Sequence, residues 1–185
     1  MSIDKLLKGN LLVAEPSILN DISFNRSVIL LTEHSLEGSV GFIINKPTNY
    51  IISDVIPTIK SQHTIYTGGP VSEDNIYFIH CVPHLIPNSI EIGEGIYWAG
   101  DFEIVTELLE SNTILENDIR FFLGYTGWEN KQLKNEIKET SWIIRKNNYS
   151  NILNVSTTSF WRNELINEGG EYKIWANAPE NPSSN

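Results

Sequence analysis

Short apolar runs separated by turn residues recur along most of this chain. Runs of about four to eight apolar residues bounded by Gly, Pro, Asn or Asp are typical of buried β-strands. The pattern predicts strands at residues 11–14, 27–32, 40–44, 64–67, 76–82, 119–125 and 142–145, and a hairpin or bulged strand at 90–98. Because only a short turn at residues 35–38 joins strands 27–32 and 40–44, we expect these two to pair antiparallel.

Helical spacing marks fewer segments. Phe102, Val105 and Leu109 fall on one face of a predicted helix, and Asp101 is placed to cap it. The pattern predicts further helices at 129–139 and 158–168, one turn of helix around Val55 capped by Ser53 or Asp54, and an amphipathic lead-in at 1–8.

These elements predict an α+β fold in which helices flank a mixed, largely antiparallel sheet. We find neither an internal repeat nor a linker, so residues 1–175 are expected to form one domain. The last residues, 176–185, contain two prolines and no apolar pattern, and a disordered tail is expected there.

The charge balance limits the classes of partner. The net charge is −10, which opposes general attraction to nucleic acid, since such binding depends on neutralising phosphates. The sequence has no apolar stretch near the roughly 20 residues that a membrane helix needs, and no signal peptide is recognisable. A single cysteine, Cys81, agrees with a reducing compartment. The sequence therefore favours a cytoplasmic protein without membrane contact.

The sequence supports none of three kinds of reactive site: a catalytic triad, a metal site or a phosphate loop. Ser27, His34 and Asp21 have the residue types of a catalytic triad, but an extended strand would place Ser27 and His34 roughly 23 Å apart. His80-Cys81-x-x-His84 has too few ligands at suitable spacing for a structural zinc site. The glycine turns at 68–70 and 124–127 match no phosphate-loop motif and favour tight turns instead. We therefore predict no catalytic residue, metal or cofactor.

One group of polar residues remains as a candidate binding site. If strands 27–32 and 40–44 pair, Arg26 lies beside Asn45 and Lys46, while Glu33 and His34 lie near the connecting turn at the opposite end. The structural alternative is an internal ion pair of Arg26, with Asp21 as the candidate acid, and an Asn45 that caps the turn before Pro47. The functional alternative is a small cationic site for a carboxylate, a phosphate or an acidic partner.

Several sequence blocks, in a constant order, resemble the AlgH family, also called UPF0301 or YqgE-like proteins. The blocks are Gly9-x-Leu11-Leu12-Val13-Ala14-x-Pro16, Phe24-x-Arg26-Ser27-Val28, Glu33-His34, Gly38-x-x-Gly41, Asn45-Lys46-Pro47, Tyr66-x-Gly68-Gly69-Pro70-Val71, Phe122-x-Gly124-Tyr125-x-Gly127-Trp128 and Gln132-Leu133-x-x-Glu136. The resemblance covers roughly residues 9–142. It departs from the commoner family pattern at Thr32, often Cys, and at Thr126, often Ala.

The resemblance implies a small cytosolic bacterial protein with a compact α+β fold and a proposed role as a transcriptional regulator, but no catalytic residues. We therefore expect a non-enzymatic binding or regulatory protein that acts through a protein partner or a small anionic ligand. The alternative is an enzyme of unrecognised type with a pocket around Arg26, Glu33, His34 and Asn45. The sequence does not decide the oligomeric state, and exposed aromatic residues could also serve self-assembly.

Overall fold

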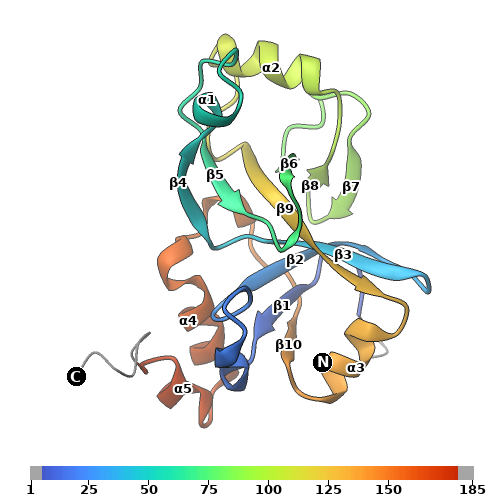
Figure 1. Ribbon diagram of the computed structural model, residues 1–185, viewed down its shortest axis with the longest axis vertical. Helices are drawn as coiled ribbons and strands as arrows, with labels where there is room; N and C mark the ends of the chain where they lie inside the picture. The colour runs from blue at the N-terminus through green and yellow to red at the C-terminus, as the bar shows by residue number, and fades with distance from the viewer. Residues whose placement is uncertain (1–5, 179–185) are drawn as a thin grey trace.

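The structure is a computed structural model, and it describes residues 6–178 (Figure 1). The strands are β1 (Leu11–Ala14), β2 (Val28–His34), β3 (Gly38–Ile43), β4 (Pro47–Ile51), β5 (Thr64–Thr67), β6 (Val71–His80), β7 (Ile90–Gly93), β8 (Ile96–Trp98), β9 (Ile119–Glu129) and β10 (Trp142–Arg145). The helices are α1 (Ile52–Val55), α2 (Phe102–Glu110), α3 (Gln132–Lys138), α4 (Thr157–Glu168) and α5 (Tyr172–Trp175), with 3-10 turns η2 (Pro16–Asn20) and η3 (Ile152–Asn154).

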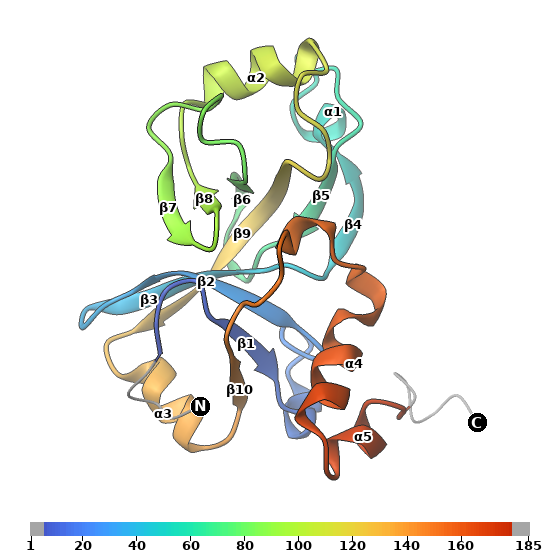
Figure 2. The ribbon, with the colours of Figure 1, turned by 180° about the vertical axis from the view of Figure 1, so that it is seen from behind.

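The long strand β9 connects two parts of one sheet (Figures 1 and 2). Its second half pairs with β3, which continues through β2 and β1 to β10. Its first half pairs with β6 on one side and with β5 on the other. Of the described strand pairs, only β5 with β9 is parallel, so the predicted mixed and largely antiparallel sheet is confirmed.

Two hydrophobic cores lie on the two sides of β9. Successive side chains of a strand point to opposite faces, so Phe121 packs with the core under α1 and α2, while Phe122 packs with the core around β1–β3 and α4. Phe122 stacks on Phe42 of β3, with ring centroids 4.8 Å apart. Both rings are fully buried, and this stacking joins β9 to β3 in the lower part of the sheet in Figure 1.

Most predicted strands are confirmed, and β1, β5 and β10 have the predicted bounds. The hairpin is also confirmed, as β7 and β8. We did not predict β4, because its residues are largely exposed and show no apolar alternation. Helix α1 begins at Ile52, so the predicted caps lie inside its first turn, although the Asp54 carboxylate does accept a hydrogen bond from the Ile51 amide at 2.9 Å.

The prediction that this strand ends at residue 125 is wrong, because β9 continues to Glu129. A Cβ atom on Gly124 would lie 2.4 Å from the Gly69 carbonyl oxygen, and Gly124 has a φ of +69°. The two glycine motifs therefore lie against each other, and Gly124 allows a close approach of backbones inside a strand rather than a turn that ends it. This extension of β9 also delays the start of α3 to Gln132.

The ends of the chain are only partly described. Of the predicted lead-in at 1–8, residues 1–5 lie outside the described residues, and Leu6 is buried in the core. Of the predicted tail at 176–185, residues 179–185 also lie outside them. Ala176 is buried, and the Ala178 carbonyl accepts a hydrogen bond from Arg26. In the described part of the chain, no helix is both long and apolar enough to span a bilayer.

Candidate functional site

The open end of the β2–β3 pair is closed by the side chain of Asn45. Its Oδ1 accepts a hydrogen bond from the Val28 amide at 2.7 Å, and its Nδ2 donates to the Arg26 carbonyl at 2.9 Å. As predicted, the strands pair antiparallel, and Ile29 lies opposite Ile43. Asn45 therefore bridges the backbone before β2 to the end of β3, and it fixes the backbone of Arg26 next to Lys46.

Arg26, Asn45 and Lys46 line one hollow of about 460 Å³, which we call the basic hollow. Its opposite wall is helix α4, which contributes Thr157, Thr158, Trp161 and Arg162. The hollow thus collects three cations from three separate segments of the chain. Among the described residues that line it, none is acidic.

Each cation of the basic hollow donates a hydrogen bond to a neutral group. Arg26 donates to the Ala178 carbonyl at 2.7 Å, and its guanidinium carbon lies 5.0 Å from the centre of the Trp161 ring. Lys46 donates from Nζ to the Ser23 carbonyl at 2.8 Å. Arg162 donates to the amide oxygen of the Asn177 side chain at 2.5 Å. These hydrogen bonds position the three side chains around the hollow.

Burial and a nearby acid act in opposite directions on Lys46. Burial lowers the pKa of its ammonium, because the charged form loses solvation, and the charge of Asp21 partly offsets this by raising the pKa. Asp21 itself is exposed, and its carboxylate accepts hydrogen bonds from the Ser23 and Phe24 amides. An anion bound in the hollow would favour the charged form of Lys46.

The start of α4 adds a partial positive charge to the same place. The residue before the helix, Ser156, makes no side-chain capping hydrogen bond, so the first amides of a 12-residue helix are not capped from within. Thr157 and Thr158 of this first turn line the basic hollow. Helix N-termini attract anions through these amides and through the helix dipole.

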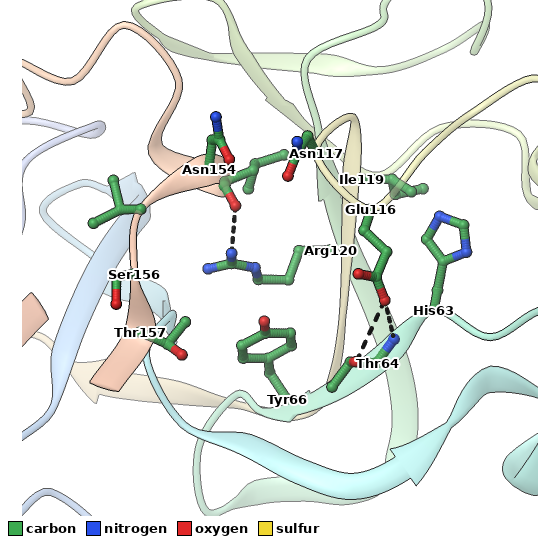
Figure 3. A pocket seen from close by; sticks show the side chains of 12 residues that line it. His63, Thr64, Tyr66, Glu116, Asn117, Ile119, Arg120, Asn154, Ser156 and Thr157 are labelled. Carbon is green, nitrogen blue, oxygen red and sulfur yellow. Dashed lines mark hydrogen bonds between the residues drawn. The ribbon is translucent and has the colours of Figure 1, made fainter. Parts of the chain in front are cut away.

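A second hollow, of about 360 Å³, lies on the other side of the start of α4 (Figure 3). We call it the Arg120 pocket, because the buried side chain of Arg120 extends into its centre. Thr157 lines both hollows. The sequence did not indicate Arg120, Thr157 or Arg162. The only local signal for Thr157 was the run of Ser and Thr at the start of the predicted helix, which is typical of helix N-termini.

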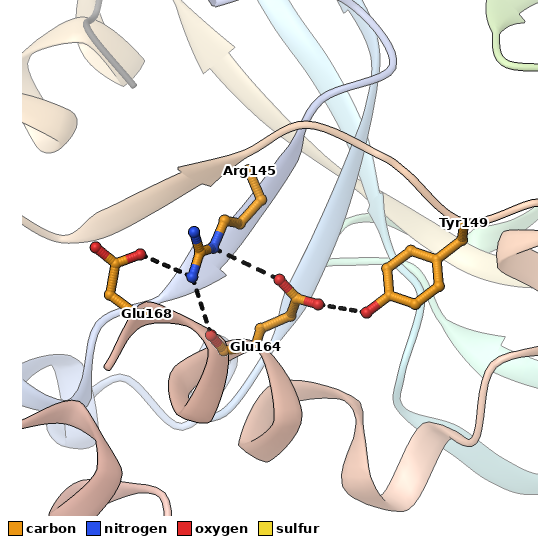
Figure 4. A network of polar contacts seen from close by, with 4 residues as sticks. All are labelled: Arg145, Tyr149, Glu164 and Glu168. Atoms are coloured by element: carbon orange, nitrogen blue, oxygen red, sulfur yellow. Dashed lines mark hydrogen bonds and ion pairs between the residues drawn. The ribbon is translucent and has the colours of Figure 1, made fainter. Parts of the chain in front are cut away.

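A polar network holds α4 in place between the two hollows (Figure 4). Arg145 of β10 forms ion pairs with Glu168 at 2.8 Å and with Glu164 at 3.6 Å, and Tyr149 donates a hydrogen bond to Glu164. Burial and this hydrogen bond raise the pKa of Tyr149, so it stays a neutral donor. On the same helix, Trp161 donates to the Ala14 carbonyl at 2.7 Å. These contacts fix the helix relative to β1 and β10.

Glu33 and His34 lie at the opposite end of β2, as predicted. His34 accepts or donates a hydrogen bond at 2.7 Å with Ser39, and it lines a separate hollow of about 250 Å³ with Lys131 and Lys134. Partial burial lowers the pKa of His34. Because Arg26 and His34 line different hollows, the enzyme pocket considered around Arg26, Glu33, His34 and Asn45 has no geometric support.

The histidine and cysteine of the considered metal motif have structural partners. His80 is fully buried, accepts from the Val82 amide and faces the Ala99 carbonyl, both at 3.3 Å. Cys81 lies 3.6 Å from the carbonyls of Asn117 and Asp118. No group of three or more potential metal ligands occurs within residues 6–178.

His80 should make the stability of the protein depend on pH. Burial lowers its pKa from 6.5 to about 4, so between these values the unfolded chain binds a proton that the folded chain does not. We expect the free energy of unfolding to fall as the pH drops from 6.5 toward 4, by up to about 1.4 kcal/mol per pH unit from this residue. Urea unfolding at several pH values measures the slope.

The variant His80→Gln should lack this component, so its stability should approach that of the wild type as the pH falls. His84→Gln, at an exposed position, controls for the substitution itself. Parallel curves for wild type and His80→Gln over the whole pH range would contradict the expectation.

The protein has an α+β fold with a cationic hollow on its surface. A family model described as AlgH-like matches residues 11–173, and the chain belongs to this family. It is 39% identical over 180 residues to a UPF0301 protein of Bacteroides fragilis, covering 96% of this chain and 91% of the relative. It is 38% identical over 183 residues to a UPF0301 protein of Chlorobium limicola, covering 98% and 97%.

Two solved structures share the fold. The solution structure of the AlgH protein from Pseudomonas aeruginosa has a TM-score of 0.74 and 23% identity, with 97% of each chain covered. A crystal structure of a Corynebacterium diphtheriae protein has a TM-score of 0.76 and 21% identity, with 96% of this chain and 95% of that chain covered. The resemblance to the AlgH family that the sequence blocks suggested is confirmed.

Proposed function

We propose that this protein is a non-enzymatic binding protein that recognises an anionic group in the basic hollow. The group would be carried by a partner protein or by a small ligand. The observation that carries this proposal is the convergence of Arg26, Lys46 and Arg162 from three distant segments, in a chain whose net charge is −10. Against that overall charge, such a local concentration of cations favours a specific anion over a general attraction to polyanions.

The side chains of the basic hollow suit binding better than catalysis. Its described lining consists of cations, amides, hydroxyls and apolar groups, without a carboxylate, imidazole or thiol that could act as a general base. A guanidinium holds a carboxylate or phosphate through paired hydrogen bonds, and an ammonium adds a point charge. The hydroxyls and amides of the first turn of α4 complete the donor set.

A regulatory role would follow from such binding. The resemblance to the AlgH family implies a transcriptional-regulator role, and we propose that this role is indirect and is exerted in the cytoplasm through the bound partner or ligand. Direct contact with DNA would bring a chain of net charge −10 against phosphates.

The double variant Lys46→Gln with Arg162→Gln tests the site. Arg26 is left unchanged, because its guanidinium also supports the fold through Trp161 and Ala178. Amide shifts of Thr157 and Thr158 in an NMR titration with phosphate and with citrate report anion binding directly. We expect saturable shifts in the wild type and an affinity lower by about tenfold for each cation removed.

The matched control is Lys60→Gln, at an exposed lysine outside the hollow. In parallel, immobilised wild type and variants capture partners from cell lysate. Thermal unfolding of each variant confirms that the fold is retained. Equal anion affinity and equal partners for wild type and the double variant would refute the proposal.

A further inference from the structure

The Arg120 pocket contains a buried cation whose hydrogen-bond partners are neutral. Arg120 is only 6% exposed and donates to the Ile44 carbonyl at 2.7 Å and to the Leu153 carbonyl at 2.5 Å. Its guanidinium carbon lies 4.4 Å from the centre of the Tyr66 ring. Carbonyls and an aromatic face orient the charge, but neither supplies the counter-charge that a buried cation favours.

The surroundings of the guanidinium can complete an anion site. Figure 3 shows the guanidinium directed toward the segment of Asn154, Ser156 and Thr157, which leads into the uncapped start of α4. The hydroxyls of Ser156 and Thr157 line the pocket on this side. A carboxylate placed there would meet the guanidinium, hydroxyl donors and the positive end of the helix dipole.

The opposite end of the pocket is acidic. Glu116 lines it and accepts only long hydrogen bonds, at 3.4 Å, from the amide and the hydroxyl of Thr64. Figure 3 shows the guanidinium of Arg120 pointing away from this carboxylate, whose charge attracts it without an ion-pair contact among the described residues. The pocket therefore has separated charges of opposite sign rather than a closed pair.

A histidine adds an unused polar atom at this acidic end. The Nδ1 of His63 forms a hydrogen bond of 2.7 Å with Ser61, and its Nε2 is buried without a partner. His63 lines the pocket next to Thr64. This nitrogen is closed to solvent, so a ligand in the pocket would reach it only after a shift of the imidazole ring.

We propose that the Arg120 pocket binds a short zwitterion of dipeptide size, with its carboxylate at Arg120 and its ammonium at Glu116. A simple anion would be repelled by Glu116 and a simple cation by Arg120, whereas a zwitterion matches both ends. The two charges of an α-amino acid sit on one carbon, whereas those of an extended dipeptide lie roughly 7 Å apart, which suits two side chains that are not in ion-pair contact. The volume of about 360 Å³ falls in the range of small-molecule sites.

Calorimetric titration with the dipeptide Ala-Ala, its N-acetyl form, its C-terminal amide and free alanine tests this site. N-acetylation removes the ammonium, and amidation removes the carboxylate. We expect Ala-Ala to bind, and the other three probes to bind at least tenfold more weakly. No binding of Ala-Ala at millimolar concentration, or equal affinity for all four probes, would overturn the proposal.

The variant Glu116→Gln tests the acidic end at an exposed residue. It should lower the affinity for Ala-Ala at least tenfold relative to Glu110→Gln, the same change at an exposed residue of α2 outside the pocket. The N-acetyl form should bind as before or more tightly, because its repulsion by Glu116 is gone. Equal weakening of both probes, or of neither, would contradict the assigned orientation.

Binding of a dipeptide in the Arg120 pocket does not depend on the cations of the basic hollow. The double variant Lys46→Gln with Arg162→Gln leaves the Arg120 pocket lining intact, so its affinity for Ala-Ala should equal that of the wild type. Loss of Ala-Ala binding in that variant would place the dipeptide in the basic hollow and overturn the assignment.

Discussion

Replacing Arg120 with methionine should lower the free energy of unfolding by about 3 kcal/mol. Two charge-assisted hydrogen bonds are lost, and two carbonyls are left without a donor in the interior. The accepting residues, Ile44 and Leu153, lie 76 and 33 positions away in the sequence, so one side chain joins three segments. Chemical denaturation monitored by circular dichroism measures the change.

Methionine keeps much of the length of the arginine stem, so the loss should come mainly from the guanidinium. The control is Arg162→Met, at an exposed arginine, which should change stability by less than about 0.5 kcal/mol. A loss at Arg120 as small as the loss at Arg162 would show that water replaces the guanidinium without cost. Arg120 would then not stabilise the fold through its charge.

Glu136→Ala should also destabilise the protein, by about 2–3 kcal/mol. A single carboxylate oxygen of Glu136 accepts hydrogen bonds from the indole nitrogens of Trp128 and Trp142, both at 2.8 Å. The other oxygen accepts from Gln132 at 3.0 Å. Alanine would leave two indole donors without their acceptor in a largely buried place. Urea unfolding followed by tryptophan fluorescence reports the effect.

Glu136→Gln keeps one acceptor oxygen but removes its charge, and it should cost about 1 kcal/mol. Glu139→Ala, at an exposed position beyond the end of the same helix, is the control and should be near neutral. Equal stability of Glu136→Ala and Glu139→Ala would mean that the indole nitrogens find other partners. The contact of Glu136 with the two indoles would then not be what stabilises this region.

Two glycine motifs show what local sequence can and cannot predict. The Gly68–Gly69 and Gly124 motifs were interpreted as two separate turns, yet they lie against each other where β9 passes the end of β5. Local composition correctly indicated an unusual backbone at each place. It could not show that the two places meet, because they are more than 50 residues apart in the sequence.

The candidate site likewise contains residues that the sequence could predict and residues that it could not. The grouping of Arg26 with Asn45 and Lys46 was predictable, because one short turn forces β2 and β3 into an antiparallel pair. Arg162 and Thr157 were not predictable, since α4 reaches the basic hollow only through its packing on β1 and β10. Arg120 resembled an ordinary polar position in an apolar strand, although it is buried and joins distant segments.

The sequence by itself determined the family, most strand positions and the ends of the β2–β3 pair, because these depend on side-chain periodicity and short turns. Only the tertiary structure decided that β9 serves two cores and that α4 separates two hollows of different charge. Those features arise from contacts between residues far apart along the chain. Such contacts are selected by the packing of whole elements, and local preferences carry no information about them.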